Sequence, residues 1–259
     1  MERIQDTKAS GLTGSALHTW GMLFLTLGIV GKSILQNRLL NLGQISAQQL
    51  LEAMQGSDTV MIYATLALVL QALETCAVPI FAFLLAEGVQ HTANFRNYCL
   101  RVAGLAALSE IPYNLAMSGK VLDLSSRNPV FGLVMALIMV YFYRRFSEKS
   151  VSHTLIRVVV TVSAILWCSM LSVKYGGCLI FVFVVMWMLR KNPSVRNIAG
   201  ASAALVCSLS SMFFMASPMG VMTIHFYNGE KGAQNRALNY LAYPVLLLAV
   251  WAAGAIFLG

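Results

Sequence analysis

The sequence predicts an all-α fold, a polytopic transmembrane helical bundle of about eight spans, within a range of seven to nine. Of its 259 residues, 58% are hydrophobic and only 11% are charged, and the mean hydropathy is +0.71. An ordinary soluble domain carries roughly 25% charged residues. A bilayer core of about 30 Å needs roughly 20 apolar residues per helical crossing, and such windows fill the chain from Leu17 onward. Residues 1–259 are therefore expected to form one integral membrane domain.

The predicted spans are apolar runs separated by short polar breaks. They lie near residues 17–36, 59–90, 97–117, 129–144, 154–172, 175–190, 197–216, 217–227 and 237–258. The second run measures about 48 Å if wholly helical, too long for one straight crossing, so Pro79 is expected to kink or break it. The run 217–227 is too short to cross alone and is expected to join its neighbour across Pro218 as a broken helix. Broken helices at membrane depth must face protein or a wet cavity.

Two segments outside these runs have a character of their own. Residues 1–16 are mixed in charge and contain no apolar core, so they are expected to be a tail rather than a cleaved signal peptide. The loop 37–58 is expected on the extracytoplasmic side, and its leucines recur at helical spacing. That pattern suits an amphipathic helix lying at the membrane surface.

Lysine and arginine are unevenly distributed over the breaks. If the breaks with Arg96, Arg144 and Arg190 face the cytoplasm, strict alternation puts the amino terminus there too. Eleven lysines and arginines then lie on that side against five on the other, with Lys231 and Arg236 undecided. Because positive charge concentrates in cytoplasmic loops, a cytoplasmic amino terminus is predicted. This bias and the anionic headgroups of the lipid bilayer account for the net charge of +8, so no nucleic-acid partner is predicted.

The cysteines give no sign of metal or redox chemistry. They stand singly, mostly in apolar context, without C-x-x-C spacing or a nearby histidine pair. We interpret them as small packing residues and predict no metal site; they are Cys76, Cys99, Cys168, Cys178 and Cys207.

Three carboxylates, Glu74, Glu87 and Glu110, lie in or beside apolar spans. A charge at the bilayer centre costs on the order of 2.5–3.5 kcal/mol on insertion scales, so each needs a partner, a wet cavity, a proton or an interfacial position. The residues leave two interpretations open. One is structural, as an ion pair of Glu87 with His91 one turn on, or as hydrogen bonds between helices. The other is a polar cavity inside the bundle, which the three together favour.

Glu110 belongs to a polar group in LAALSEIPYNLAM. Pro112 loosens the helix there, and Ser109, Tyr113 and Asn114 are expected to face inward with the carboxylate. A separate polar stretch is HFYNGEKG, residues 225–232. Its Asn-Gly and Lys-Gly pairs predict a tight turn whose exposed amides, beside a lysine, suit a phosphate or another anion. The alternative is an ordinary loop.

Four motifs then follow one another along the chain: VPIFAFLLAEGVQHT, RVAGLAALSEIPYNLA, FYNGEKG and YLAYP. In this order they resemble the TraX family of multi-span membrane proteins, and the strongest block runs from Pro79 to Leu115. The family is named for a conjugation protein that acetylates the amino terminus of pilin. It is similar to wider groups of membrane acyltransferases that use cytoplasmic acyl-CoA.

The resemblance implies a bacterial plasma-membrane acyltransferase. An acetyl or other acyl group would pass from acetyl-CoA, entering from the cytoplasmic side, to an amine or hydroxyl on a protein amino terminus or small molecule. Such a transfer needs a base for the acceptor's proton and donors for the oxyanion and the phosphates. By position, Glu87 and Glu110 become candidates for the base or its orienting partner. The candidates for the anion site are Asn228, Gly229, Lys231 and Gly232.

Two departures from the family pattern open an alternative. Family members commonly carry an Asp-His pair where this chain has Gly28 and Ile29, and a histidine where it has Leu246. His18, about three turns upstream of that pair, is the candidate substitute catalytic residue, and His225 is a second one. The missing histidines favour a non-enzymatic membrane protein of the same fold, a small-molecule carrier or a partner of an envelope or conjugation assembly. The FYNGEKG turn and the glutamates favour the enzyme.

Overall fold

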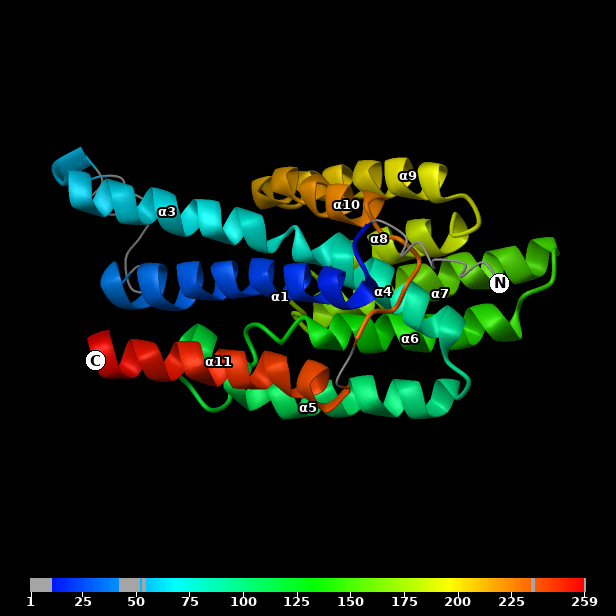
Figure 1. Ribbon diagram of the computed structural model, residues 1–259, viewed down its shortest axis with the longest axis horizontal. Helices are drawn as coiled ribbons and strands as arrows, with labels where there is room; N and C mark the ends of the chain where they lie inside the picture. Colours follow the sequence, from blue (N-terminus) through cyan, green and yellow to red (C-terminus); the bar gives the residue numbers. More distant parts are fainter. Residues whose placement is uncertain (1–10, 42–51, 53–54, 234–235, 259) are drawn as a thin grey trace, which may run out of the picture.

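The computed structural model describes residues 11–41, 52, 55–233 and 236–258. It is 79% helix, with no strand among the described residues, so the predicted all-α class is confirmed. The helices run roughly along one long axis and form an elongated bundle (Figure 1). Residues 1–10 of the predicted tail, and most of the segment in which a surface helix was predicted, lie outside the described residues.

The described residues form a succession of helices. In chain order they are α1 (Gly14–Val30), η1 (Gly31–Leu39), α3 (Asp58–Glu74), α4 (Ala77–His91), α5 (Phe95–Ser118), α6 (Val130–Arg145), α7 (Val151–Met170), α8 (Gly176–Met188), α9 (Pro193–Val206), η2 (Cys207–Leu209), η3 (Met212–Ala216), α10 (Pro218–His225) and α11 (Arg236–Leu258). α5 and α11 lie along one side of the bundle and α9 and α10 along the opposite side (Figure 1).

Four described stretches are long and apolar enough, by length and composition, to cross a membrane. They are Gly14–Leu39, Asp58–His91, Val151–Met170 and Asn239–Ile256, while Gly176–Met188 and Met212–His225 are apolar but shorter. α7 turns a broad apolar face outward, with Leu155 and Val159 more than half exposed, as expected of a surface covered by lipid. The integral membrane class is supported, and the count of seven to nine spans stays a prediction.

The second predicted span is interrupted four residues before Pro79. α3 ends at Glu74 and α4 begins at Ala77, because the proline ring has no room beside the carbonyl of residue i−4, which is Thr75. That carbonyl instead accepts a hydrogen bond from Ser217 Oγ at 3.0 Å. The Thr75 hydroxyl bonds the carbonyls of Ala72 (2.7 Å) and Phe213 (3.1 Å). Side chains thus satisfy the backbone groups that the break releases.

The prediction of one continuous span over 197–216 is wrong. α9 ends at Val206, and the chain passes through η2 and η3 before α10. Ser210 Oγ donates to the carbonyl of Cys207 at 2.7 Å, and such a local bond competes with the helical ladder. The expected join across Pro218 is confirmed, since η3 leads directly into α10 with the proline at its first position, where a proline costs no hydrogen bond.

The two interruptions pack against each other inside the protein. Cys76 Sγ lies 3.1 Å from the carbonyl oxygen of Ala216, and Gly220 approaches the carbonyl of Cys76 so closely that a Cβ would collide with it. Thr75, Cys76 and Ser217 are all fully buried. The α3–α4 break and the Ser217 end of the second interruption therefore meet the condition for irregular backbone at membrane depth, which is burial in protein. Leu209 and Met212, earlier in the second interruption, are exposed.

This contact generates a prediction about stability. Gly220→Ala should push the two interrupted helices apart and destabilise the protein by about 1–3 kcal/mol, the usual range for overpacking. Gly104→Ala is the matched control, because no atom lies within 4 Å of a Cβ built there. Alanine at an open helical position should raise the free energy of unfolding by about 0.5–1 kcal/mol relative to glycine. Thermal unfolding in detergent measures both. Equal melting temperatures for the two variants would contradict the packing.

Candidate functional site

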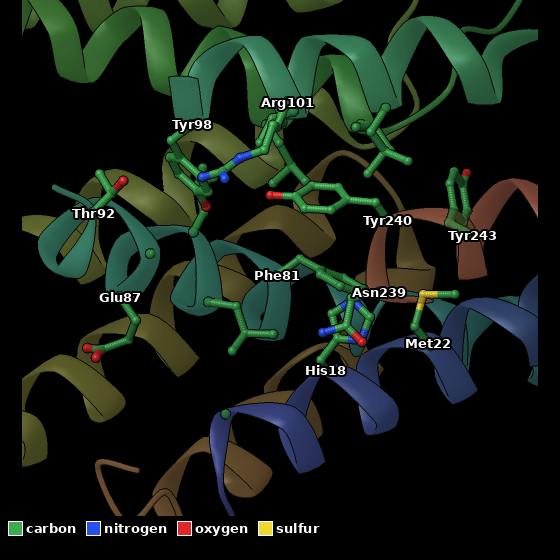
Figure 2. Close-up of a pocket in the computed structure, with 18 of the residues that line it drawn as sticks. His18, Met22, Phe81, Glu87, Thr92, Tyr98, Arg101, Asn239, Tyr240 and Tyr243 are labelled. Atoms are coloured by element: carbon green, nitrogen blue, oxygen red, sulfur yellow. The ribbon is translucent and has the colours of Figure 1, made fainter. Parts of the chain in front are cut away.

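A cavity of about 700 Å³ lies between α1, α4, α5 and α11. Its wall is mainly apolar, and the polar side chains on it include His18, Glu87, Tyr98, Arg101, Asn239 and Tyr240 (Figure 2). Residues 92–94 also line it, so it reaches the end of the bundle where α4 meets α5, α6 meets α7 and α8 meets α9 (Figure 1). We call this the basic end. Its cations are Arg96, Arg101, Arg144, Arg145, Lys149, Arg157, Arg190, Lys191 and Arg196.

His18 and Glu87 both lie on the cavity wall, as expected of catalytic candidates. His18, in the second turn of α1, packs edge-to-face on Phe81 with ring centroids 5.8 Å apart. Asn239 of α11 projects into the same part of the cavity (Figure 2). An imidazole in such a place can take up and release a proton.

Glu87 has partners as well as a place on the wall. Its carboxylate lies 3.7 Å from His91 Nδ1, the pairing that the spacing predicted, and 4.0 Å from Arg196 Nη1. Arg196 is buried and its guanidinium lies 4.5 Å over the ring of Phe83. His91 and Arg196 thus hold the Glu87 carboxylate, which also lies on the cavity wall.

The FYNGEKG turn is clasped against the start of α1. Gly14 N donates to the carbonyl of Glu230 (2.8 Å), and Ser15 N donates to that of Lys231 (3.0 Å). Gly232, at φ 73°, has no room for a side chain beside Thr13. The turn therefore caps the helix that carries His18.

The four residues predicted to bind an anion in this turn are divided by the structure. Gly229 and Lys231 line the cavity, whereas Asn228 and Gly232 do not belong to its lining. Asn228 Oδ1 accepts a hydrogen bond from Glu230 N at 2.9 Å. Of the predicted anion site, the lysine therefore lies on the cavity wall, whereas the asparagine stabilises the turn.

Glu110 lies away from the cavity lining. Its carboxylate pairs with Arg127 Nη1 and accepts from Asn128 N, both at 3.3 Å. Asn128, fully buried, also donates to Ser109 Oγ at 3.1 Å and to the carbonyl of Ala106 at 3.0 Å. These bonds tie α5 to the segment that leads into α6, which is the structural interpretation of Glu110.

Glu74 forms a buried ion pair. Its Oε1 is 2.6 Å from Lys174 Nζ, and the carboxylate is only 2% exposed. Gly28 of α1 packs directly on Glu74, leaving no room for a Cβ. Glu74 Oε2 is buried without a hydrogen-bond partner among the described residues. The pair joins the break between α3 and α4 to the α7–α8 connection.

The other two predicted cavity residues are buried beside this region. Tyr113 shares a hydrogen bond with Ser126 Oγ at 3.1 Å, and Asn114 Nδ2 lies 3.4 Å from the carbonyl of Val121. Neither belongs to the cavity lining. The predicted polar group is therefore brought together, but it forms the packed interior and not the cavity wall.

Sequence reasoning missed much of the polar wall, including Tyr98, Arg101, Asn239 and Tyr240. Helical spacing offered a signal, because Tyr98 and Arg101 fall on one face of α5, as do Tyr240 and Tyr243 on α11. What the spacing does not give is that these two faces meet across a cavity.

The fold and the cavity define a class, an integral membrane protein whose apolar helical bundle holds a mainly apolar cavity with several polar side chains on its wall. A family model described as TraX protein matches residues 35–253. The chain therefore belongs to the TraX family, as the motifs indicated. The match begins after His18 and Gly28. Comparison with curated proteins and with solved structures gives no match.

The buried ion pair generates the second prediction. Lys174→Met should lower the free energy of unfolding by about 3–5 kcal/mol, because it leaves the Glu74 carboxylate buried and unpaired. The double variant Glu74→Gln with Lys174→Met should recover most of that loss. Lys120→Met is the control, since Lys120 is exposed. Thermal unfolding in detergent reports the result, and a double variant as unstable as Lys174→Met would contradict it.

Proposed function

We propose that this protein is a membrane acyltransferase that moves an acetyl or other acyl group from coenzyme A to an amine or hydroxyl acceptor. The observation that carries the proposal is the cavity, which brings a histidine, His18, and a cation, Lys231, to one space that reaches the basic end. Membership of a family named for an acetylase of pilin amino termini supports the same chemistry. The acceptor is a protein amino terminus or a small molecule.

The placement in the membrane is part of the proposal. The basic end faces the cytoplasm of a bacterial plasma membrane, with the amino terminus on the same side, because lysine and arginine concentrate in cytoplasmic loops. Acyl-CoA then meets the cavity from the compartment that holds it. The shorter apolar helices complete the crossings, within the predicted seven to nine.

The reaction follows from the groups on the wall. The acceptor's nitrogen or oxygen attacks the thioester carbonyl, and its proton passes to the imidazole of His18. Asn239, beside His18, supplies an N–H donor for the oxyanion (Figure 2). The carbon–sulfur bond then breaks, and the thiolate of coenzyme A takes the proton back from the imidazole. Glu87, fixed by His91 and Arg196, shapes this wall, while Glu74 and Glu110 hold the helices.

One observation favours the second candidate, a non-enzymatic carrier. Interrupted helices that meet inside the bundle, as at Cys76 and Ala216, are typical of transporter binding sites. Side-chain hydroxyls occupy the carbonyls of Thr75 and Cys207 at these breaks, which favours a structural role for them. The carrier therefore ranks second.

The test combines binding with turnover. Calorimetry on the detergent-purified protein should show salt-sensitive binding of coenzyme A and acetyl-CoA that Lys231→Ala weakens. His18→Gln should keep binding but lower the release of free thiol from acetyl-CoA by about 10²–10⁴-fold, the usual contribution of a general base. His225→Gln, an exposed histidine that is not part of the cavity lining, is the control. Absence of coenzyme A binding, or unchanged turnover in His18→Gln, would refute the acyltransferase.

A further inference from the structure

Arg101 stands on the cavity wall together with two tyrosines. It lies in the second turn of α5, and Tyr98 precedes it by three residues on the same face. Tyr240 approaches from α11, which packs along α5. Figure 2 shows the guanidinium of Arg101 extending beside Tyr98, with the hydroxyl of Tyr240 directed toward them. One guanidinium and two hydroxyls thus converge from two helices.

Other arginines at the basic end are engaged by the protein. Arg144 donates to the carbonyl of Val89 at 2.9 Å and lies 4.5 Å over the ring of Phe95. Arg190 donates to the carbonyl of Trp187 at 2.7 Å. Arg101 has no hydrogen bond, ion pair or ring contact to any residue in the part of the chain that the structure describes.

The cavity wall therefore carries unbalanced positive charge. Glu87 is the only carboxylate on the described wall, and Arg196 and His91 already hold it. Arg101 and Lys231 are left without an acidic partner on that wall. Both cations are exposed and so can be reached by a ligand. Because charges of one sign on a cavity wall attract the opposite sign, the wall is complementary to a ligand with more than one negative charge.

The geometry of the donors selects among anions. A guanidinium presents paired N–H groups that match the oxygens of a phosphate, and tyrosine hydroxyls add further donors. The Tyr98 hydroxyl reaches its place because Gly88 has no side chain, since a Cβ there would come within 2.5 Å of it. The close approach of Tyr98 on α5 to Gly88 on α4 thus depends on the missing side chain.

We propose that Arg101, Tyr98 and Tyr240 form a phosphate-binding subsite of the cavity, with Lys231 as a second cation on the same wall. The subsite takes phosphate esters or diphosphates. Under the proposed function, on which only the identity of the ligand rests, these are the phosphates of coenzyme A. A phospholipid headgroup offers the same chemistry from the bilayer.

The experiment uses phosphates that carry no acyl group. Binding of inorganic pyrophosphate and of adenosine 3′,5′-bisphosphate to the detergent-purified full-length protein is measured by calorimetry. Arg101→Gln should weaken both by about 10–100-fold, as expected for loss of hydrogen bonds to a charged group. Arg101→Lys should restore only part of the affinity, since an ammonium does not bind in the bidentate way. Arg96→Gln, which removes an exposed arginine that is not part of the cavity lining, should change nothing.

Two further variants separate this subsite from general effects. Gly88→Ala should weaken pyrophosphate binding by displacing Tyr98 while the charge stays the same. The melting temperature of Arg101→Gln should match that of the parent, because Arg101 has no hydrogen bond, ion pair or ring contact to lose among the described residues. Three results would each overturn the proposal. They are an equal loss of pyrophosphate affinity in Arg96→Gln and Arg101→Gln, an unchanged affinity in Arg101→Gln, and a lower melting temperature of Arg101→Gln.

The outcome also tells this proposal from the proposed function. Arg101-dependent pyrophosphate binding in a protein that never cleaves acetyl-CoA keeps the subsite and removes the acyltransferase. Acetyl-CoA cleavage that survives Arg101→Gln with unchanged affinity keeps the enzyme and removes the subsite. Competition against pyrophosphate by nanodiscs of phosphatidylglycerol, but not of phosphatidylcholine, supports the subsite with a lipid headgroup as its ligand.

Discussion

The ion pair of Glu74 and Lys174 fixes the interior of this bundle. Glu74 is the last residue of α3, at the break before α4, and the ion pair links that break to the connection between α7 and α8. Gly28 lets α1 lie against the same carboxylate. Separating two buried charges is costly, so arrangements of α1, α3 and the α7–α8 connection that part this pair are disfavoured. Tyr175, beside Lys174, then lines the cavity.

The polar groups of the chain divide by task. Glu74 and Glu110 each hold a cation inside the bundle, and Glu87 is shared between the wall and Arg196. Apart from Glu87, the polar side chains on the mainly apolar cavity wall are neutral donors, imidazoles and cations. Most of these carboxylates are paired with cations in the packed interior, whereas the cavity wall carries more positive than negative charge. Such a wall is suited to negatively charged ligands.

Most helices could be predicted from the sequence, because apolar runs of the right length leave few alternatives in a bilayer. The run 97–117 became α5 and 129–144 became α6 with small shifts at their ends. The end of α9 could not be predicted, because it is marked by one hydrogen bond, from Ser210 Oγ to the carbonyl of Cys207, which leaves no trace in the hydropathy of the sequence. At the site, Glu87 was singled out by its cost in an apolar segment, and His18 as a substitute for a histidine that the family pattern carries and this chain lacks. Sequence reasoning missed Tyr98, Arg101 and Tyr240, because they come together only through the packing of α5 on α11, which the sequence does not reveal.

The backbone clasp between residues 12–15 and the 226–231 turn joins distant parts of the chain. The carbonyls that accept from Gly14 and Ser15 belong to a turn that is synthesised long after α1. These amides can therefore meet their partners only after α10 has been made. Gly14 and Lys231 both line the cavity, so this part of its wall is a late product of folding.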